Sequence, residues 1–158
     1  VAVDPPVTAH GDACGIVVCG RREGRAYVLA DRSVRGLSPV GWAKAAVKAA
    51  EDFDAQLVLA EANQGGEMVR TLIAQVGGEV PIKLVHATRS KKARAEPVAA
   101  LYEQGRVVHC GAFPALEEEL MAMGSEHQGH SPDRADALVW AVTDLLLAGR
   151  VQPRLRAL

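Results

Sequence analysis

The sequence predicts a single α/β domain built on a mixed five-stranded sheet with helices on both faces. Three observations predict it: strand-like apolar runs open the chain, helical and strand-like patterns alternate after them, and the composition is globular. Of 158 residues, 49% are hydrophobic and 23% are charged, which excludes a disordered chain. Aromatic residues are only 4%, so the core is aliphatic and an array of stacking platforms for single-stranded nucleic acid is not expected.

The first part of the chain predicts three strands and a helix. Residues 1–4 form a short apolar strand that Pro5-Pro6 ends. Residues 13–20 and 26–30 form a hairpin across a polar turn. Ser38 caps a helix that has proline in its first turn. Apolar residues then recur at helical spacing, at Trp42, Ala45, Ala46, Ala49 and Phe53.

Strands and helices alternate over the rest of the chain. Strands are expected at 56–60, running into Glu61, at 81–85 and, at most as a short strand, at 107–109. Helices are expected at 66–76, 90–103, 116–123 and 131–147. Gly65-Gly66 opens the first of these helices, and Pro97 interrupts or restarts the second. The predicted order is βββαβαβα, with helical crossovers that make the first and fourth strands neighbours.

The cysteines indicate the redox environment of the protein, and the two ends of the chain indicate how far the domain extends. Cys14, Cys19 and Cys110 are an odd number without a CxxC pair, and the first two fall on opposite faces of one strand. Reduced thiols favour an intracellular, cytoplasmic protein, and no apolar run reaches the ~20 residues of a membrane span.

The chain begins with valine inside a strand-like run, so we expect a fragment that lacks its upstream part. A domain over residues 1–149 precedes a short basic tail over residues 150–158.

Acidic residues lie where several predicted elements reach one edge of the sheet. Asp4 ends the first strand, Glu61 ends the fourth, and Asp136 lies in the first two turns of the last helix, one turn after Asp133. Ligands bind at the carboxyl ends of strands in open α/β sheets, and i, i+3 spacing puts both helix acids on one side. Carboxylates this close repel unless a divalent cation offsets their charge, and oxygen donors favour Mg²⁺ or Mn²⁺. Two such ions can clamp an in-line phosphoryl displacement, so the cluster predicts phosphodiester hydrolysis.

Each acid also has a plainer interpretation. Asp4 can cap the turn before Pro5, and Asp133 can complement the helix dipole. Glu61 and Asp136 can be solvent-facing charges. That interpretation is less favoured, because Glu61 follows a run typical of a buried strand and Asp136 adjoins an apolar stripe.

A dense basic run follows the fifth strand. It contains Arg89, Lys91, Lys92 and Arg94. The net charge of −1 excludes a uniformly basic coat, but a local patch here would hold duplex phosphates without reading sequence. A solvated helix start is the alternative. Arg134 either touches phosphate or pairs with Asp133 or Glu126, and His130 either moves a proton or is a loop histidine without a role.

Three segments in order resemble a known family. VAVDPP at the start, LAEANQGGEMV in the middle and SPDRADALVWAV near the end resemble the nuclease domain of the large terminase subunit of tailed bacteriophages or phage-like gene transfer agents. The likeness extends through RAEPVAALYEQGRVVH and LEEEL, so it covers almost the whole chain. It implies a ribonuclease H-like fold with Asp4, Glu61 and Asp136 as catalytic residues. Asp4 would bridge two ions, Glu61 and Asp136 would hold one each, and Asp133 is the candidate fourth ligand.

The resemblance also implies an activity and partners. It implies a metal-dependent endonuclease that cuts double-stranded DNA during genome packaging, in the bacterial cytoplasm and with little sequence specificity. Its expected partners are the portal protein, the small terminase subunit and an upstream ATPase domain, whose GxxxxGK(S/T) element this chain does not contain. The isolated domain is expected to be monomeric. Two other interpretations stay open: another ribonuclease H-like nuclease such as a Holliday-junction resolvase, and a non-catalytic DNA- or protein-docking module.

Overall fold

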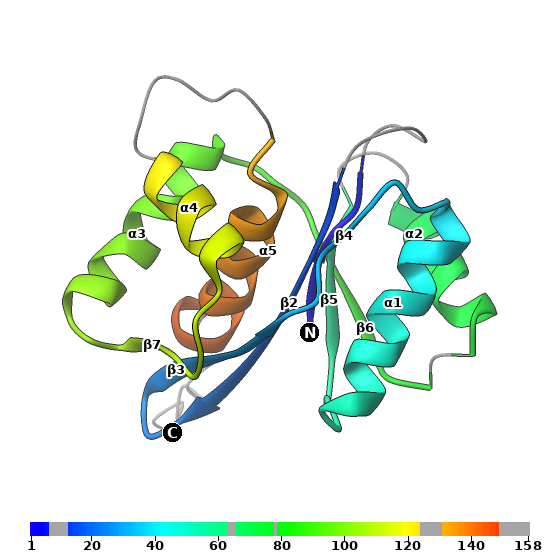
Figure 1. Cartoon of the computed structure of the whole chain (residues 1–158), viewed down its shortest axis with the longest axis horizontal. Coiled ribbons are helices and arrows are strands. Elements are labelled where there is room, and N and C mark those ends of the chain that lie inside the picture. The colour runs from blue at the N-terminus through cyan, green and yellow to red at the C-terminus, as the bar shows by residue number, and fades with distance from the viewer. Residues whose placement is uncertain (7–12, 63–65, 78, 124–130, 149–158) are drawn as a thin grey trace, which may run out of the picture.

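The computed structural model describes residues 1–6, 13–62, 66–77, 79–123 and 131–148 (Figure 1). Within these residues a mixed sheet has the strand order β6-β5-β1-β2-β3-β7, and β4 pairs with β2 beside this path. The strands are β1 (Ala2–Asp4), β2 (Ala13–Arg22), β3 (Arg25–Asp31), β4 (Val34–Arg35), β5 (Val58–Glu61), β6 (Ile82–Val85) and β7 (Val107–His109). The helices are α1 (Pro39–Asp52), α2 (Gly66–Gln75), α3 (Lys91–Glu103), α4 (Pro114–Ala122), α5 (Asp133–Val142) and the π-helical η1 (Thr143–Leu147).

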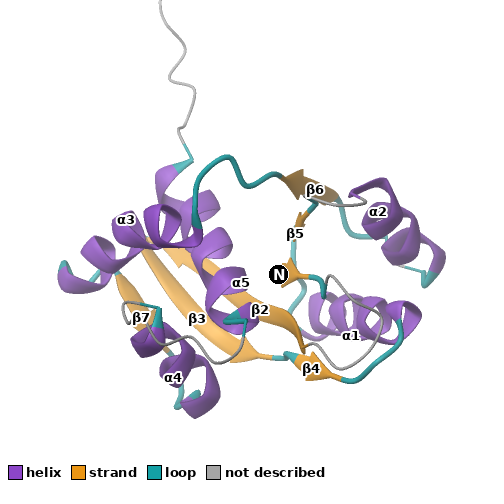
Figure 2. Cartoon of the chain, turned by 90° about the horizontal axis from the view of Figure 1, so that it is seen from above, coloured by secondary structure: helices purple, strands orange, loops and turns teal. Residues whose placement is uncertain are grey.

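Helices cover both faces of the sheet, as the sequence predicts. Figures 1 and 2 show α1 and α2 on one face and α3, α4 and α5 on the other. Alternate residues of β2 serve the two cores, because successive side chains of a strand point to opposite faces. Ile16 packs in the core under α1 and α2, whereas Val17 packs in the core under α3, α4 and α5. Cys14 and Cys19 also lie on opposite faces, as expected, and all three cysteines are free.

The pairing of β1 positions the candidate acids. β1 runs parallel to β5, with Val3 opposite Ala60, and antiparallel to β2, with Asp4 opposite Gly15. The first and fourth strands expected from the sequence correspond to β1 and β5. The prediction that they are neighbours in the sheet is therefore confirmed. Asp4 and Glu61, each the last residue of its strand, reach the same sheet edge.

Several predicted boundaries are wrong for physical reasons. The described sheet has seven strands rather than five. The short strand expected at 107–109 is present as β7, whereas β4 was not expected, because two residues are too few to show a period of two. Pro97 neither interrupts nor restarts α3, since the buried Val98 and Leu101 hold the second half of the helix on the core. The last helix does not stay α-helical to Leu147 but turns into η1 after Val142. Gly65, Gly78, Gly149 and the 150–158 tail lie outside the described residues.

The Ser38 cap is confirmed, since its Oγ accepts a hydrogen bond from the Gly41 amide at 3.2 Å. None of the described helices is both long and apolar enough to cross a bilayer.

Candidate active site

The four candidate acids come from three elements that meet at one sheet edge. β1 and β5 supply Asp4 and Glu61, and the first turn of α5 supplies Asp133 and Asp136. Asp133 and Asp136 are the buried charged residues among those described, with exposed fractions of 8% and 1%. A buried carboxylate needs a compensating partner, so this arrangement identifies the edge as a site of strong electrostatic interaction.

A glycine in β2 lets α5 approach the sheet. Gly15 lies opposite Asp4, and a Cβ there would meet the backbone oxygen of Asp133 at 1.9 Å. A real Cβ cannot stand so close to a backbone atom. The missing side chain at Gly15 therefore allows the first turn of α5 to lie directly against the strand that pairs with Asp4.

The acids act on one another electrostatically. Burial raises the pKa of Asp4 well above its ordinary value, and the negative charges of Asp136, Glu61 and Asp133 raise it further. Burial is also the largest cause of the raised pKa of Asp133 and of Asp136. All four carboxyl groups thus belong to one cluster, in which full ionisation is costly without added positive charge.

Arg94 supplies part of that charge from α3. Its guanidinium donates to Glu61 Oε2 and to Asp136 Oδ1, each at 3.3 Å. It also lies over the ring of Trp140, 4.7 Å from the centroid, and the Trp140 indole donates to Glu61 Oε2 at 2.5 Å. Arg94 therefore holds acids from two different elements together.

Lys91, one turn earlier on α3, pairs with the other oxygen of Asp136. Its ammonium forms an ion pair with Asp136 Oδ2 and donates to Ser131 Oγ at 3.2 Å. The predicted basic run is therefore divided: Lys91 and Arg94 reach the acids, whereas Arg89 and Lys92 are exposed. Contact of any of these four with DNA stays a prediction.

The donor set can be compared with what a divalent ion requires. Buried carboxylate oxygens without His or Cys suit Mg²⁺ or Mn²⁺. Besides burial, the negative charges of the neighbouring acids raise the pKa of Asp4. A divalent ion would neutralise these negative charges. Among the described residues, no three His, Cys, Asp or Glu side chains converge closely enough to hold an ion in this conformation. The residues fit a divalent ion by chemistry and location, with Lys91 and Arg94 now providing the countercharge.

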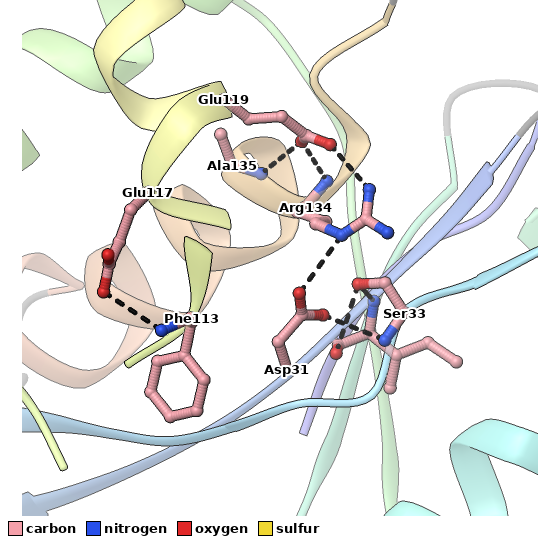
Figure 3. A network of polar contacts seen from close by, with 8 residues as sticks. Asp31, Ser33, Phe113, Glu117, Glu119, Arg134 and Ala135 are labelled. Carbon is pink, nitrogen blue, oxygen red and sulfur yellow. Dashed lines mark hydrogen bonds and ion pairs between the residues drawn. The ribbon is translucent and has the colours of Figure 1, made fainter. Parts of the chain in front are cut away.

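Glu119 of α4 holds the start of α5, as Figure 3 shows. Its Oε2 accepts hydrogen bonds from the backbone amides of Arg134 and Ala135 at 2.8 and 3.2 Å. Its Oε1 accepts from the Arg134 guanidinium at 2.8 Å, and Arg134 Nε donates to Asp31 at 3.1 Å. Arg134 thus pairs with Glu119 and Asp31, whereas the sequence offered Asp133 or Glu126 as partners and phosphate contact as the alternative. Its proposed DNA contact is untested, and Glu126 and His130 lie outside the described residues.

We predict that Glu119→Ala lowers the melting temperature by about 4–8 °C. The substitution leaves two helix N-terminal amides without their acceptor and removes one partner of Arg134, a loss of about 2 kcal/mol. Thermal unfolding measures the shift. Glu118→Ala is the matched control, since Glu118 is the exposed neighbour on the same helix. Equal melting temperatures for the two variants would show that Glu119 does not support α5.

Sequence reasoning missed Trp140, Glu119 and the inward direction of Lys91 and Arg94. For Trp140 a signal was available in its spacing of four from Asp136, because residues i and i+4 share a helix face. Glu119 carried no comparable signal, since its partners follow 15 and 16 residues later in the chain.

Comparisons with known proteins find a matching family model and solved structures of similar fold. Residues 1–145 match the family model described as terminase RNaseH-like domain. The structure resembles the large terminase nuclease from thermophilic phage G20c, with a TM-score of 0.69 and 17% identity over 90% of this chain and 79% of that one. It also resembles the human cytomegalovirus terminase nuclease domain, with a TM-score of 0.64 and 15% identity over 89% of this chain and 79% of that one.

The third solved structure is Thermus thermophilus RuvC, with a TM-score of 0.52 and 18% identity over 93% of this chain and 92% of that one. At these identities the three structures show a shared fold, which confirms the predicted ribonuclease H-like architecture. A comparison with curated proteins finds no significant match.

Proposed function

Since the chain belongs to the terminase RNaseH-like domain family, we propose that it is a metal-dependent endonuclease that cuts double-stranded DNA during genome packaging. The observation that carries the proposal is that Asp4, Glu61 and Asp136 lie at one sheet edge, with Asp133 beside them, near enough for the other three charges to act on Asp4. The human cytomegalovirus structure with a similar fold was soaked with manganese, which supports divalent ions as cofactors.

The proposed roles follow from the position of each acid. Asp4, Glu61 and Asp136 would together hold the divalent ions, with Asp133 as the further ligand, since the charges of the other three acids all act on Asp4. Bound Mg²⁺ or Mn²⁺ would supply a nucleophile from water and offset the charge of the phosphodiester. Arg94 and Trp140 would orient Glu61 through the hydrogen bonds already described.

The exposed basic residues support a duplex substrate. Arg89 lies just before α3 and Lys92 in its first turn, close in sequence to the residues that reach the acids, and both would hold backbone phosphates. Such contacts position a duplex without reading its bases, so cutting with little sequence specificity is expected. In this proposal the domain works in the bacterial cytoplasm with the portal protein, the small terminase subunit and an ATPase domain.

We expect the purified chain to nick or linearise plasmid DNA with Mg²⁺ or Mn²⁺ and to lose this activity in excess chelator. Agarose gel analysis of plasmid, four-way junction and RNA–DNA hybrid substrates measures it. Undiminished cutting in chelator would contradict the proposed chemistry. The fold shared with RuvC makes a junction resolvase the second candidate, and a strong preference for four-way junctions would favour it. Metal binding without any cutting would indicate a docking module.

A further inference from the structure

Lys91 and Arg94 pair with the same acid but are held very differently. The Arg94 side chain is 10% exposed, spans Glu61 and Asp136 and is stacked on Trp140. The Lys91 side chain is 44% exposed, and its protein partners are one oxygen of Asp136 and the hydroxyl of Ser131. Arg94 is thus a built-in part of the site, whereas Lys91 reaches into it from the solvent side.

The oxygen that Lys91 contacts is an unusual one. Asp136 Oδ2 is buried and has no hydrogen bond of regular geometry within the described part of the chain. The ion pair with Lys91 compensates its charge. The same ammonium also acts electrostatically on Asp4 and Asp133, as it lowers the pKa of both. One half-exposed positive charge therefore acts on three of the four acids proposed to hold metal.

We propose that Lys91 is a resident countercation of the acidic site and that a divalent ion displaces its ammonium from Asp136. This inference rests on the proposed function, because it requires that these acids bind a divalent ion. A doubly charged ion with hard oxygen ligands gains more from the carboxylates than one ammonium does. A lysine ammonium is strongly hydrated on a flexible stem, so a half-exposed Lys91 can return to water. Arg94, stacked and doubly paired, stays in place.

The proposal predicts that removal of a positive charge here tightens ion binding. In Lys91→Met, the Mn²⁺ dissociation constant measured by titration calorimetry without DNA falls about fivefold, as expected when one partly exposed ion pair no longer competes. Lys92→Met is the matched control, because it removes the same charge from the exposed neighbouring position. Its Mn²⁺ affinity stays within about twofold of the parent protein, since Lys92 is exposed and solvent screens its charge.

Thermal unfolding in chelator provides a second measurement. Lys91→Met melts at a lower temperature than the parent protein, and saturating Mn²⁺ removes the difference, whereas Lys92→Met shows neither effect. Lys91→Gln, which keeps a donor for Ser131, tests the same point if the methionine variant does not fold. Unchanged or weaker Mn²⁺ binding in these Lys91 variants overturns the proposal. If the parent protein still binds Mn²⁺ and cuts DNA, the proposed function survives that result. If the parent binds no Mn²⁺, both fail.

Discussion

Asp4→Asn should abolish DNA cutting and, in the absence of metal, make the protein more stable. If Asp4 holds divalent ions as proposed, a neutral amide cannot replace its carboxylate. The cleavage rate should then fall by about a thousandfold or more, which corresponds to ~4 kcal/mol of transition-state stabilisation. The gain in stability follows from the raised pKa of Asp4, which burial and the neighbouring acids cause. Plasmid cleavage with Mg²⁺ and thermal unfolding in chelator measure the two effects.

The direction of the stability change depends on the pH. The folded state binds a proton at Asp4 more tightly than the unfolded chain does, because its pKa is raised on folding. Stability is therefore retained at pH values below the ordinary aspartate pKa and is lost as the pH rises towards the folded-state pKa. At pH 7 the asparagine variant avoids this loss and should melt about 2–4 °C higher, for a gain of about 1 kcal/mol. The difference should shrink as the pH is lowered.

An exposed carboxylate away from the site controls for the loss of charge. Glu51→Gln on α1 removes one negative charge from an exposed position and should change neither cutting nor the melting temperature. Retained cutting in Asp4→Asn would remove Asp4 from the proposed catalytic set. A lower melting temperature in chelator would instead show that the charged form of Asp4 stabilises the fold, contrary to the electrostatic argument.

Gly15→Ala should have the largest effect on stability of the substitutions considered. The new Cβ would lie 1.9 Å from the backbone oxygen of Asp133 and 2.5 Å from its carbonyl carbon. Backbone atoms cannot rotate away as a side chain can, so either α5 or β2 must move. The expected cost is about 3 kcal/mol, which lowers the melting temperature by about 6–12 °C.

The same displacement should weaken the site, because α5 carries Asp133 and Asp136. A misplacement of about 1 Å can reduce catalysis about a hundredfold. Gly20→Ala on the same strand is the matched control, since a Cβ there meets Leu29 at an ordinary 3.6 Å. Thermal unfolding and plasmid cleavage should separate the two variants. Equal behaviour would mean that close packing of α5 on β2 does not require a glycine.

The elements of this fold were largely predictable because their signals are local. The Ser38 cap, the two-strand hairpin and the alternation of strands and helices depend on residues a few positions apart. The placement of Asp4 and Glu61 at neighbouring strand ends followed from the order of elements and from the connection rules for mixed sheets. The strand that the sequence did not predict is β4, a segment of two residues that is held by pairing alone.

The direction of side chains around the acids was not predictable in the same way. A basic run after a strand is compatible both with a DNA-facing surface and with an internal countercharge, and its composition is the same in either case. The orientation of α3 over the sheet decides that Lys91 and Arg94 reach Asp136 while Lys92 remains exposed. Likewise, Glu119 supports α5 only because α4 packs beside it.

Residue types and their order along the chain therefore establish which chemistry is available at the sheet edge, namely carboxylates at strand ends and on the last helix. The packing of α3, α4 and α5 on that edge establishes which charges neutralise them and how closely the helix can approach at Gly15. The physical reason is the separation of the interacting residues along the sequence. Helix caps and hydrophobic periodicity depend on residues within one or two turns of each other. An ion pair such as Arg94 with Glu61 joins residues 33 positions apart and exists only after the core has formed.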